Sequence, residues 1–366
     1  MSTKPVDYYE QRERDAILRT REILKRLPPA CEEFISDIRM NTSPLTRLAY
    51  AYDLDVFFQF LSREVPAFEG RQPVSFNYQD INVVTGRNIR QYADYLLLYY
   101  NQDEKEISNR AHGQMRKLSS IRSFFKYLFI NEKITQNTAE LIELPKIHEK
   151  PILRLEIDEI ARILDAAESG EALSERQKKW HSKTKARDLA IITLFLGTGI
   201  RVSELVGLDI DKIDFTSNSL LVTRKGGKQM MLYFSEEVAG ALKAYLTERK
   251  EIQPLEGDEK ALFLSMQKSR LTVRAVENLV KKYALIAAPL KPKLSPHKLR
   301  STYGTALYQE TGDIYLVADV LGHSDVNTTK RHYAAMSDER RRMAAKAVTL
   351  RENVKEDMDE AEIPDE

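Results

Sequence analysis

The sequence predicts a mainly α protein, in which an all-helical N-terminal domain precedes an α-rich mixed domain with a small antiparallel β-sheet. Three observations support this prediction. Apolar residues recur at helical spacing through most of the 366 residues. A stretch with two prolines and little periodicity, residues 144–155, divides the chain. Between residues 219 and 234, two strand-like segments flank Gly226-Gly227, a pair that supplies the positive φ angles of a tight hairpin turn.

The N-terminal domain, residues 1–143, is predicted to hold four or five helices. An amphipathic helix over 8–27 is closed by Pro28-Pro29. A second helix begins after Thr42-Ser43-Pro44, where a capping residue precedes proline, and runs to about residue 61. Helical spacing returns at 85–100 and 109–130.

The second domain is predicted over 156–345, after an interdomain linker at 144–155 and before an acidic tail at 346–366. A chain of this length can bury a separate core in each of two domains. The helices predicted in the second domain span 156–167, 186–199, 236–250, 271–286, 298–310 and 313–321.

Composition excludes several classes of protein. With 42% hydrophobic and 30% charged residues, the chain is typical of a globular protein. Cys31 is its one cysteine, which excludes an intramolecular disulfide. The longest apolar run, near 189–200, is too short to cross a bilayer, and the N-terminus lacks the apolar segment of a signal peptide. We therefore predict a cytoplasmic protein with no membrane association.

The near-neutral net charge hides an uneven distribution. Residues 351–366 contain eight acidic and two basic side chains, a local charge of −6. Because the whole chain carries +1, the remaining residues carry +7 by subtraction. A basic body with an acidic tail suggests a polyanionic partner, although solvated basic surfaces are also common.

The first candidate functional side chains along the chain lie at a glycine-rich turn and at the predicted hairpin. Arg201 follows the glycine-rich turn of GTGIRVSEL (197–205) at a helix start, and Glu204 lies one turn later on the same face. The alternative is an ordinary surface ion pair. Lys225 opens the KGGK turn, where its ammonium could reach over a groove or simply keep the turn soluble.

Two further places lie nearer the C-terminus. In LSPHKLRSTYGTAL (294–307), a helix start at Ser295-Pro296 places His297 and Arg300 on one face of the first turn, a position that favours an anion. A satisfied surface pair is the alternative. In LGHSDVNTTKRHY (321–333), His323 precedes Tyr333 by ten residues. Half-buried packing is the alternative for that tyrosine.

Taken together, these residue types suit chemistry on a phosphodiester. Arginines bind non-bridging oxygens bidentately and stabilise the charge that develops in the transition state. A phenolic oxygen can act as a nucleophile, and a lysine or histidine can protonate the leaving oxygen. Such a site needs no metal ion and no other cofactor.

The set of motifs resembles the catalytic domain of the tyrosine recombinases, the phage integrase family, and most of all its Xer-type members. The shared motifs are TGIRVSEL, TRKGGK, SPHKLR and LGHSDVNTT with a following tyrosine, in the family's order over roughly 155–340. The resemblance implies the DNA breaking-rejoining fold for this part of the chain. It implies a helical core-binding domain of the SAM-like type for the N-terminal half.

The resemblance also implies a role for each residue. Arg201 and Arg300 would clamp the scissile phosphate, with Glu204 supporting the first arginine. Lys225 would protonate the 5′ oxygen, and His297 and His323 would bind the phosphate and help to move the nucleophile's proton. Tyr333 would attack phosphorus and form a 3′-phosphotyrosyl link. In Xer-type relatives this tyrosine usually follows the histidine by nine residues, whereas the interval here is ten.

The implied partner is double-stranded DNA with an inverted-repeat core site, bound by a homo-tetramer across two sites or by a dimer on one site. An accessory or directionality protein could take part. The same chemistry also fits an integrase or transposase of a mobile element and a type IB topoisomerase. The non-enzymatic alternatives are a DNA-binding regulator and a helical scaffold protein.

Overall fold

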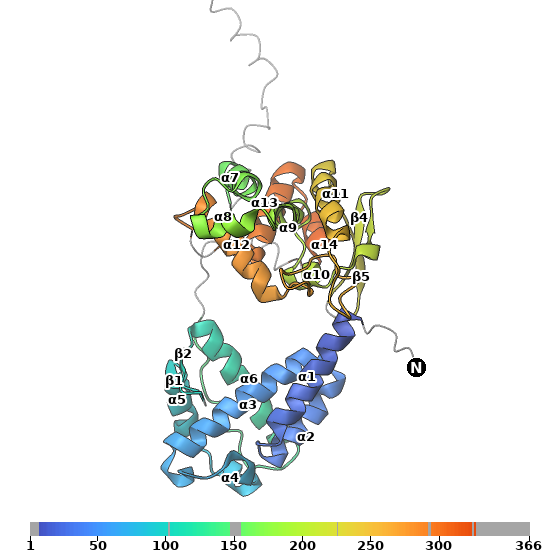
Figure 1. Cartoon of the computed structure of the whole chain (residues 1–366). Helices are drawn as coiled ribbons and strands as arrows, with labels where there is room; N and C mark the ends of the chain where they lie inside the picture. The colour runs from blue at the N-terminus through green and yellow to red at the C-terminus, as the bar shows by residue number, and fades with distance from the viewer. Residues whose placement is uncertain are drawn as a thin grey trace, which may run out of the picture. The chain divides into compact units, whose positions relative to one another are not determined.

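The computed structural model describes residues 7–323 and residue 326, apart from residues 102, 147–154, 225 and 292–293. The chain divides after Lys150 into two compact units (Figure 1). Each unit buries apolar side chains of its own. The mainly helical fold with small antiparallel sheets confirms the predicted fold class. No helix in the described part of the chain is long and apolar enough to cross a membrane.

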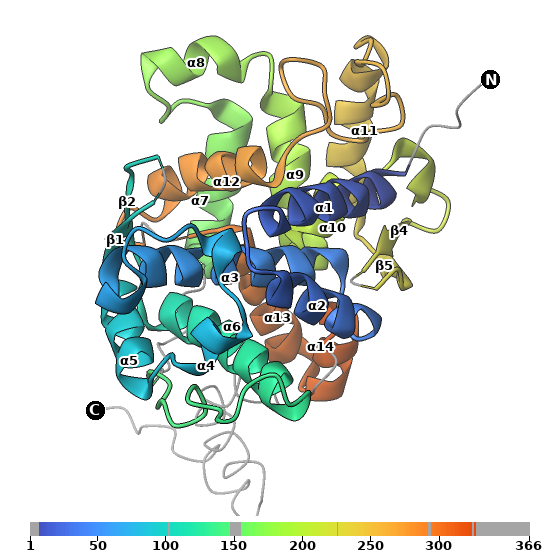
Figure 2. The ribbon, with the colours of Figure 1, turned by 90° about the horizontal axis from the view of Figure 1, so that it is seen from below.

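The N-terminal unit is built mainly from helices that pack on α3. Helices α1, α2 and α6 all contact α3, and the neighbouring ribbons can be followed in Figures 1 and 2. At the start of α3, the Ser43 side chain accepts a hydrogen bond from the Thr46 backbone N–H, and Pro44 occupies the first helical position. The helices of this unit are α1 (Tyr8–Leu24), α2 (Pro29–Asp37), α3 (Pro44–Glu64), α4 (Tyr78–Asn82), α5 (Gly86–Tyr95) and α6 (Ala111–Ile130).

A β-hairpin corrects the prediction that this half is all-helical. The helix predicted over 85–100 ends at Tyr95, and β1 (Leu98–Tyr100) pairs antiparallel with β2 (Glu106–Ser108). Within β1 the side chains alternate exposed, buried, exposed, which is the two-residue period of a strand. The Asn101 side chain accepts hydrogen bonds from two backbone N–H groups of the turn and so closes the hairpin.

Aromatic side chains fill the core of the N-terminal unit. Phe34, Phe57, Phe58, Phe124 and Phe125 are all at most 1% exposed. Their rings meet mostly edge to face, the arrangement that the ring quadrupole favours. Cys31 lies in the same core with no exposed surface, and burial raises the pKa of its thiol well above the usual value.

A buried carboxylate joins α3 to α6. Asp53, which has no exposed surface, accepts hydrogen bonds from Arg116 Nη1 at 2.5 Å, Ser120 Oγ at 2.7 Å and Lys117 Nζ at 3.3 Å. Because Lys117 is itself only 10% exposed, removing the carboxylate would leave a buried ammonium without its counter-charge.

We predict that Asp53→Ala lowers the free energy of unfolding by about 3 kcal/mol, the cost of breaking a buried ion pair on one side. Urea denaturation measures the change. The control is Asp103→Ala, whose carboxylate faces Lys105 at 3.8 Å with both side chains more than 70% exposed. That variant should lose less than about 0.5 kcal/mol. Equal losses in the two variants would contradict the prediction.

The second unit is arranged around α9, which α7, α11 and α13 all contact (Figure 1). Eight residues of α9 are buried, consistent with the long apolar run at this position. The helices of this unit are α7 (Ile157–Ser169), α8 (Glu175–His181), α9 (Lys185–Thr198), α10 (Val202–Val206), α11 (Glu236–Lys250), α12 (Val273–Ala287), α13 (Pro296–Thr311) and α14 (Ile314–Leu321).

The predicted hairpin is confirmed within a three-stranded sheet. Strand β4 (Ser219–Thr223) pairs antiparallel with β5 (Gln229–Tyr233), and Gly226 and Gly227 both have φ near 80° (81° and 77°). A short strand, β3 (Ile213–Asp214), pairs with the other edge of β4 and was not predicted. Helix α8, which precedes α9, was not predicted either.

A second buried polar network ties α8, α9 and α12 together. Asp188 Oδ2 accepts hydrogen bonds from Lys282 Nζ and Tyr283 Oη, both at 2.9 Å. Nδ1 of His181 lies 3.2 Å from Tyr283 Oη, and burial lowers the pKa of this histidine below its ordinary value of 6.5. His181 therefore favours its neutral form in the folded chain.

The pH dependence of stability follows from that lowered pKa. Below pH 6.5 the unfolded chain takes up a proton on His181 that the folded chain resists, so the free energy of unfolding falls as the pH drops through this value. We predict that His181→Asn makes this fall shallower when urea denaturation is repeated between about pH 7.5 and pH 5.5. A constant stability offset with an unchanged slope would contradict the prediction.

Candidate functional site

Two glycine-capped helix ends form the frame of the candidate site. Helix α9 ends at Gly199 and α14 ends at Gly322, and both glycines have left-handed backbone angles, with φ of 61° and 59°. A Cβ on Gly199 would lie 2.5 Å from the Tyr303 ring and 2.9 Å from Leu321. The two helix ends therefore pack closely against each other. The last carbonyls of each helix have no hydrogen-bond partner within the helix.

Arg201 is held from two sides just after the first of these caps. Its Nη1 donates to Glu204 Oε1 at 2.7 Å, and its Nη2 donates to the Gly322 carbonyl at 2.8 Å. The Arg201 backbone N–H donates to the second carboxylate oxygen of Glu204 at 3.0 Å. Glu204 is 2% exposed and Arg201 is 35% exposed. The predicted Arg201–Glu204 pair is thus present, and a guanidinium with five donors keeps some of them for an anion.

Arg300 approaches the same turn from α13. It is 5% exposed and donates hydrogen bonds to the carbonyls of Gly199 and Leu321. The Arg201 and Arg300 guanidinium groups therefore bind adjacent residues at the end of α14, although 99 positions separate them in the chain. The partial negative charge at the C-terminal ends of α9 and α14 stabilises these cations.

The predicted histidines are placed differently from each other. His323 directly follows Gly322, is partly buried, and its backbone N–H donates to the Ala318 carbonyl at 2.9 Å. His297 lies in the first turn of α13 after Pro296, as predicted, but its side chain is exposed whereas that of Arg300 is buried. Lys225 and Tyr333 lie outside the described residues.

A third arginine, Arg224, lies at the same place and was not singled out among the motif residues. Its Nη2 donates to the Val320 carbonyl at 3.0 Å, and its Nε lies 3.7 Å from Glu204 Oε1. The guanidinium rests against Gly322, where a Cβ would come within 1.6 Å of Nη1. Burial lowers the pKa of Arg224. The Glu204 carboxylate opposes this shift, and the nearby charge of Arg201 adds to it. The sequence feature that could have pointed to Arg224 is its position directly before Lys225 in TRKGGK.

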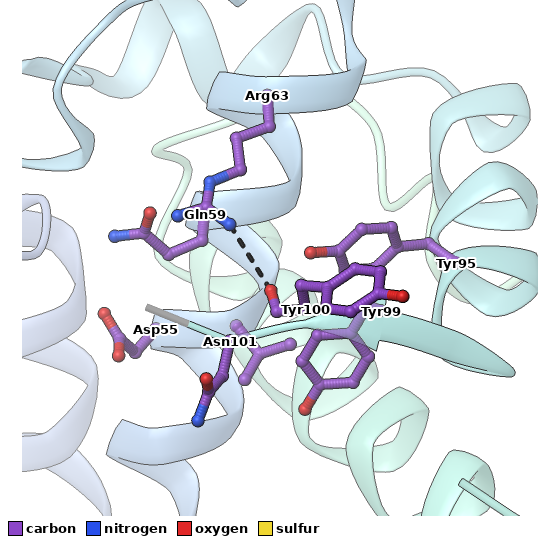
Figure 3. A pocket seen from close by; sticks show the side chains of 8 residues that line it. Asp55, Gln59, Arg63, Tyr95, Tyr99, Tyr100 and Asn101 are labelled. Carbon is purple, nitrogen blue, oxygen red and sulfur yellow. Dashed lines mark hydrogen bonds between the residues drawn. The ribbon is translucent and has the colours of Figure 1, made fainter. Parts of the chain in front are cut away.

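A pocket in the N-terminal unit holds none of the predicted residues. In Figure 3 tyrosine side chains gather beside Arg63, whose Nη1 donates to the Tyr100 carbonyl at 3.3 Å. Burial raises the pKa of both Tyr95 and Tyr99, which makes their phenols poor nucleophiles. The pocket is lined by Asp55, Val56, Gln59, Arg63, Tyr95, Tyr99, Tyr100 and Asn101.

Comparison with known proteins identifies one family, by a family model and by a curated relative. The model of the phage integrase family matches residues 154–340. A relative named tyrosine recombinase XerC, from Caldanaerobacter subterraneus subsp. tengcongensis, is 35% identical over 315 residues, which is 83% of this chain and 82% of the relative.

Solved structures show the same fold. The XerH site-specific recombinase bound to a palindromic difH substrate, in a post-cleavage complex, has a TM-score of 0.63 at 20% identity. That match covers 92% of this chain and 89% of the other. The Tn1549 transposon integrase in complex with circular intermediate DNA has a TM-score of 0.58 at 21% identity, covering 84% and 95% of the two chains.

The contact between Gly322 and Arg224 can be tested by stability. We predict that Gly322→Ala costs more than Gly257→Ala, because both positions have positive φ but only the first has a side chain against it. The left-handed conformation should cost each variant about 1 kcal/mol. Displacing the buried arginine should cost Gly322→Ala about 1–3 kcal/mol more.

A double mutant isolates that second contribution. In an Arg224→Ala background the extra cost of Gly322→Ala should disappear, which urea denaturation of the four variants measures. Strict additivity of Gly322→Ala and Arg224→Ala would contradict the contact.

Proposed function

The chain belongs to the phage integrase family, and on that basis we propose that it is a site-specific DNA recombinase of the Xer type. It cleaves and rejoins DNA strands through a 3′-phosphotyrosyl intermediate. The observation that supports this function best is the convergence of Arg201 and Arg300 on the turn that ends α14. Guanidinium groups bind the non-bridging oxygens of a phosphodiester through paired N–H donors, and these two are held on neighbouring carbonyls.

The proposed reaction needs no external energy. Tyr333 Oη attacks phosphorus, the bond from phosphorus to the 5′ oxygen breaks, and Lys225 gives its proton to that leaving oxygen. His297 and His323 bind the phosphate and help to accept the proton of the tyrosine hydroxyl. In the reverse step the 5′ hydroxyl of another strand attacks the phosphotyrosyl group and releases the tyrosine.

Arg201 and Arg300 contribute electrostatically. Negative charge accumulates on the non-bridging oxygens as the tyrosine attacks, and preorganised guanidinium groups stabilise that charge without having to move. Glu204 keeps Arg201 in place through the 2.7 Å ion pair. A surface that neutralises phosphates in this way binds DNA less tightly as salt rises.

We further propose a cytoplasmic enzyme that acts on an inverted-repeat core site, with a dimer on each site and a homo-tetramer across two. Strand exchange requires four cleavable strands and therefore four nucleophiles, which a symmetric assembly supplies. We expect each of the predicted domains, 1–143 and 156–345 joined by 144–155, to contact the duplex. An accessory or directionality protein would set the outcome of the reaction.

A nicked suicide substrate tests the nucleophile. We predict that the wild-type chain forms a covalent adduct with the nicked duplex, because the cleaved fragment diffuses away and religation is prevented, and that Tyr333→Phe forms none. The adduct is measured as a shifted band on a denaturing gel. The control is Tyr315→Phe, which removes the hydroxyl of a 71% exposed tyrosine on α14 and should leave the adduct yield unchanged. An adduct with Tyr333→Phe would assign the nucleophile to another residue.

A further inference from the structure

We propose that Arg224 is a positioning residue for Arg201. The inference rests on the proposed function, because it assigns Arg201 to the scissile phosphate. Arg224 contacts both groups that hold the Arg201 guanidinium. Its Nε lies 3.7 Å from Glu204 Oε1, the atom that pairs with Arg201 Nη1. Its guanidinium also rests on Gly322, whose carbonyl accepts the hydrogen bond from Arg201 Nη2.

Arg224 also ties two chain segments together at this point. It directly follows β4, and its backbone N–H and carbonyl bond to Lys228 and Gly227 across the hairpin turn. Its Nη2 bonds the Val320 carbonyl in the last turn of α14. A displacement of Arg224 would therefore move the Gly322 carbonyl and the Glu204 carboxylate together, and Arg201 would lose its orientation from both sides.

The burial of the Arg224 guanidinium at this place costs more free energy than packing alone would justify. Arg224 is 13% exposed, its Nε has no hydrogen-bond partner among the described residues, and it lies close enough to Arg201 for the two charges to repel. An apolar side chain of similar size would pack against Gly322 without these costs, although it would leave the Val320 carbonyl without this donor. Such local violations of packing rules concentrate at functional sites.

The test compares Arg224→Gln with wild type on substrates of different charge. On an ordinary phosphodiester we expect Arg224→Gln to form the covalent adduct about 10- to 100-fold more slowly, because misplacing a catalytic group by about an ångström has an effect of this size. A methylphosphonate at the scissile position removes the negative charge that Arg201 stabilises. On that substrate the rates of adduct formation by Arg224→Gln and by Arg201→Gln should both lie closer to the wild-type rate.

A second substrate separates the phosphate clamp from leaving-group protonation. A 5′-bridging phosphorothiolate releases a thiolate that needs no proton, so it should restore Lys225→Ala but not Arg224→Gln. The matched control is Arg274→Gln, which removes an 80% exposed arginine from α12 and should behave as wild type on every substrate. Duplex binding by gel shift and the urea midpoint show whether Arg224→Gln remains folded and DNA-bound.

The outcomes distinguish failure of the inference from failure of the function. The inference is overturned if Arg224→Gln cleaves the phosphodiester at the wild-type rate. It is also overturned if the phosphorothiolate restores cleavage by Arg224→Gln, because Arg224 would then act through Lys225 on leaving-group protonation. If neither modified substrate brings the cleavage rate of Arg224→Gln closer to that of wild type, its role is structural and the inference is likewise overturned. The proposed function itself fails if wild type forms no adduct. It also fails if the cleavage rate of Arg201→Gln is no closer to the wild-type rate on the methylphosphonate substrate than on the phosphodiester.

Discussion

Backbone carbonyls at two helix ends hold the arginine side chains, and the candidate site depends on this interaction. The carbonyls of Gly199, Val320, Leu321 and Gly322 accept hydrogen bonds from Arg300, Arg224 and Arg201. They are available because the helices α9 and α14 stop at left-handed glycines, which turn the chain and leave the last carbonyls without a helical partner. The positions of the cations are therefore set by where two helices end.

Holding cations with carbonyls has an electrostatic advantage over holding them with carboxylates. A carboxylate beside each arginine would cancel the positive charge that an anionic phosphate needs, whereas a carbonyl dipole orients the guanidinium and leaves its net charge intact. Glu204 is shared between Arg201 and Arg224, so one negative charge serves two positive ones. The site keeps an excess of positive charge while its donors remain ordered.

The sequence predicts local features well and long-range packing poorly. The helix starts, the Gly226-Gly227 hairpin and the Arg201–Glu204 pair follow from short-range rules of capping, turn geometry and i,i+3 spacing, and the structure contains all of them. The same spacing places His297 and Arg300 together, but only tertiary packing decides that one is exposed and the other buried. Arg224 was overlooked because its partners, Val320 and Gly322, lie almost a hundred residues away. The β1–β2 hairpin was missed because its leucines and tyrosines also fit a helix.

The burial of Cys31 makes the chain convenient for site-specific labelling. Its thiol has no exposed surface, and its raised pKa keeps it protonated and unreactive toward maleimides at neutral pH. It is also the one cysteine in the sequence. A cysteine introduced at an exposed position would therefore carry a fluorophore selectively, without first replacing the native thiol. Labels placed in the two units would then report their separation as DNA is bound.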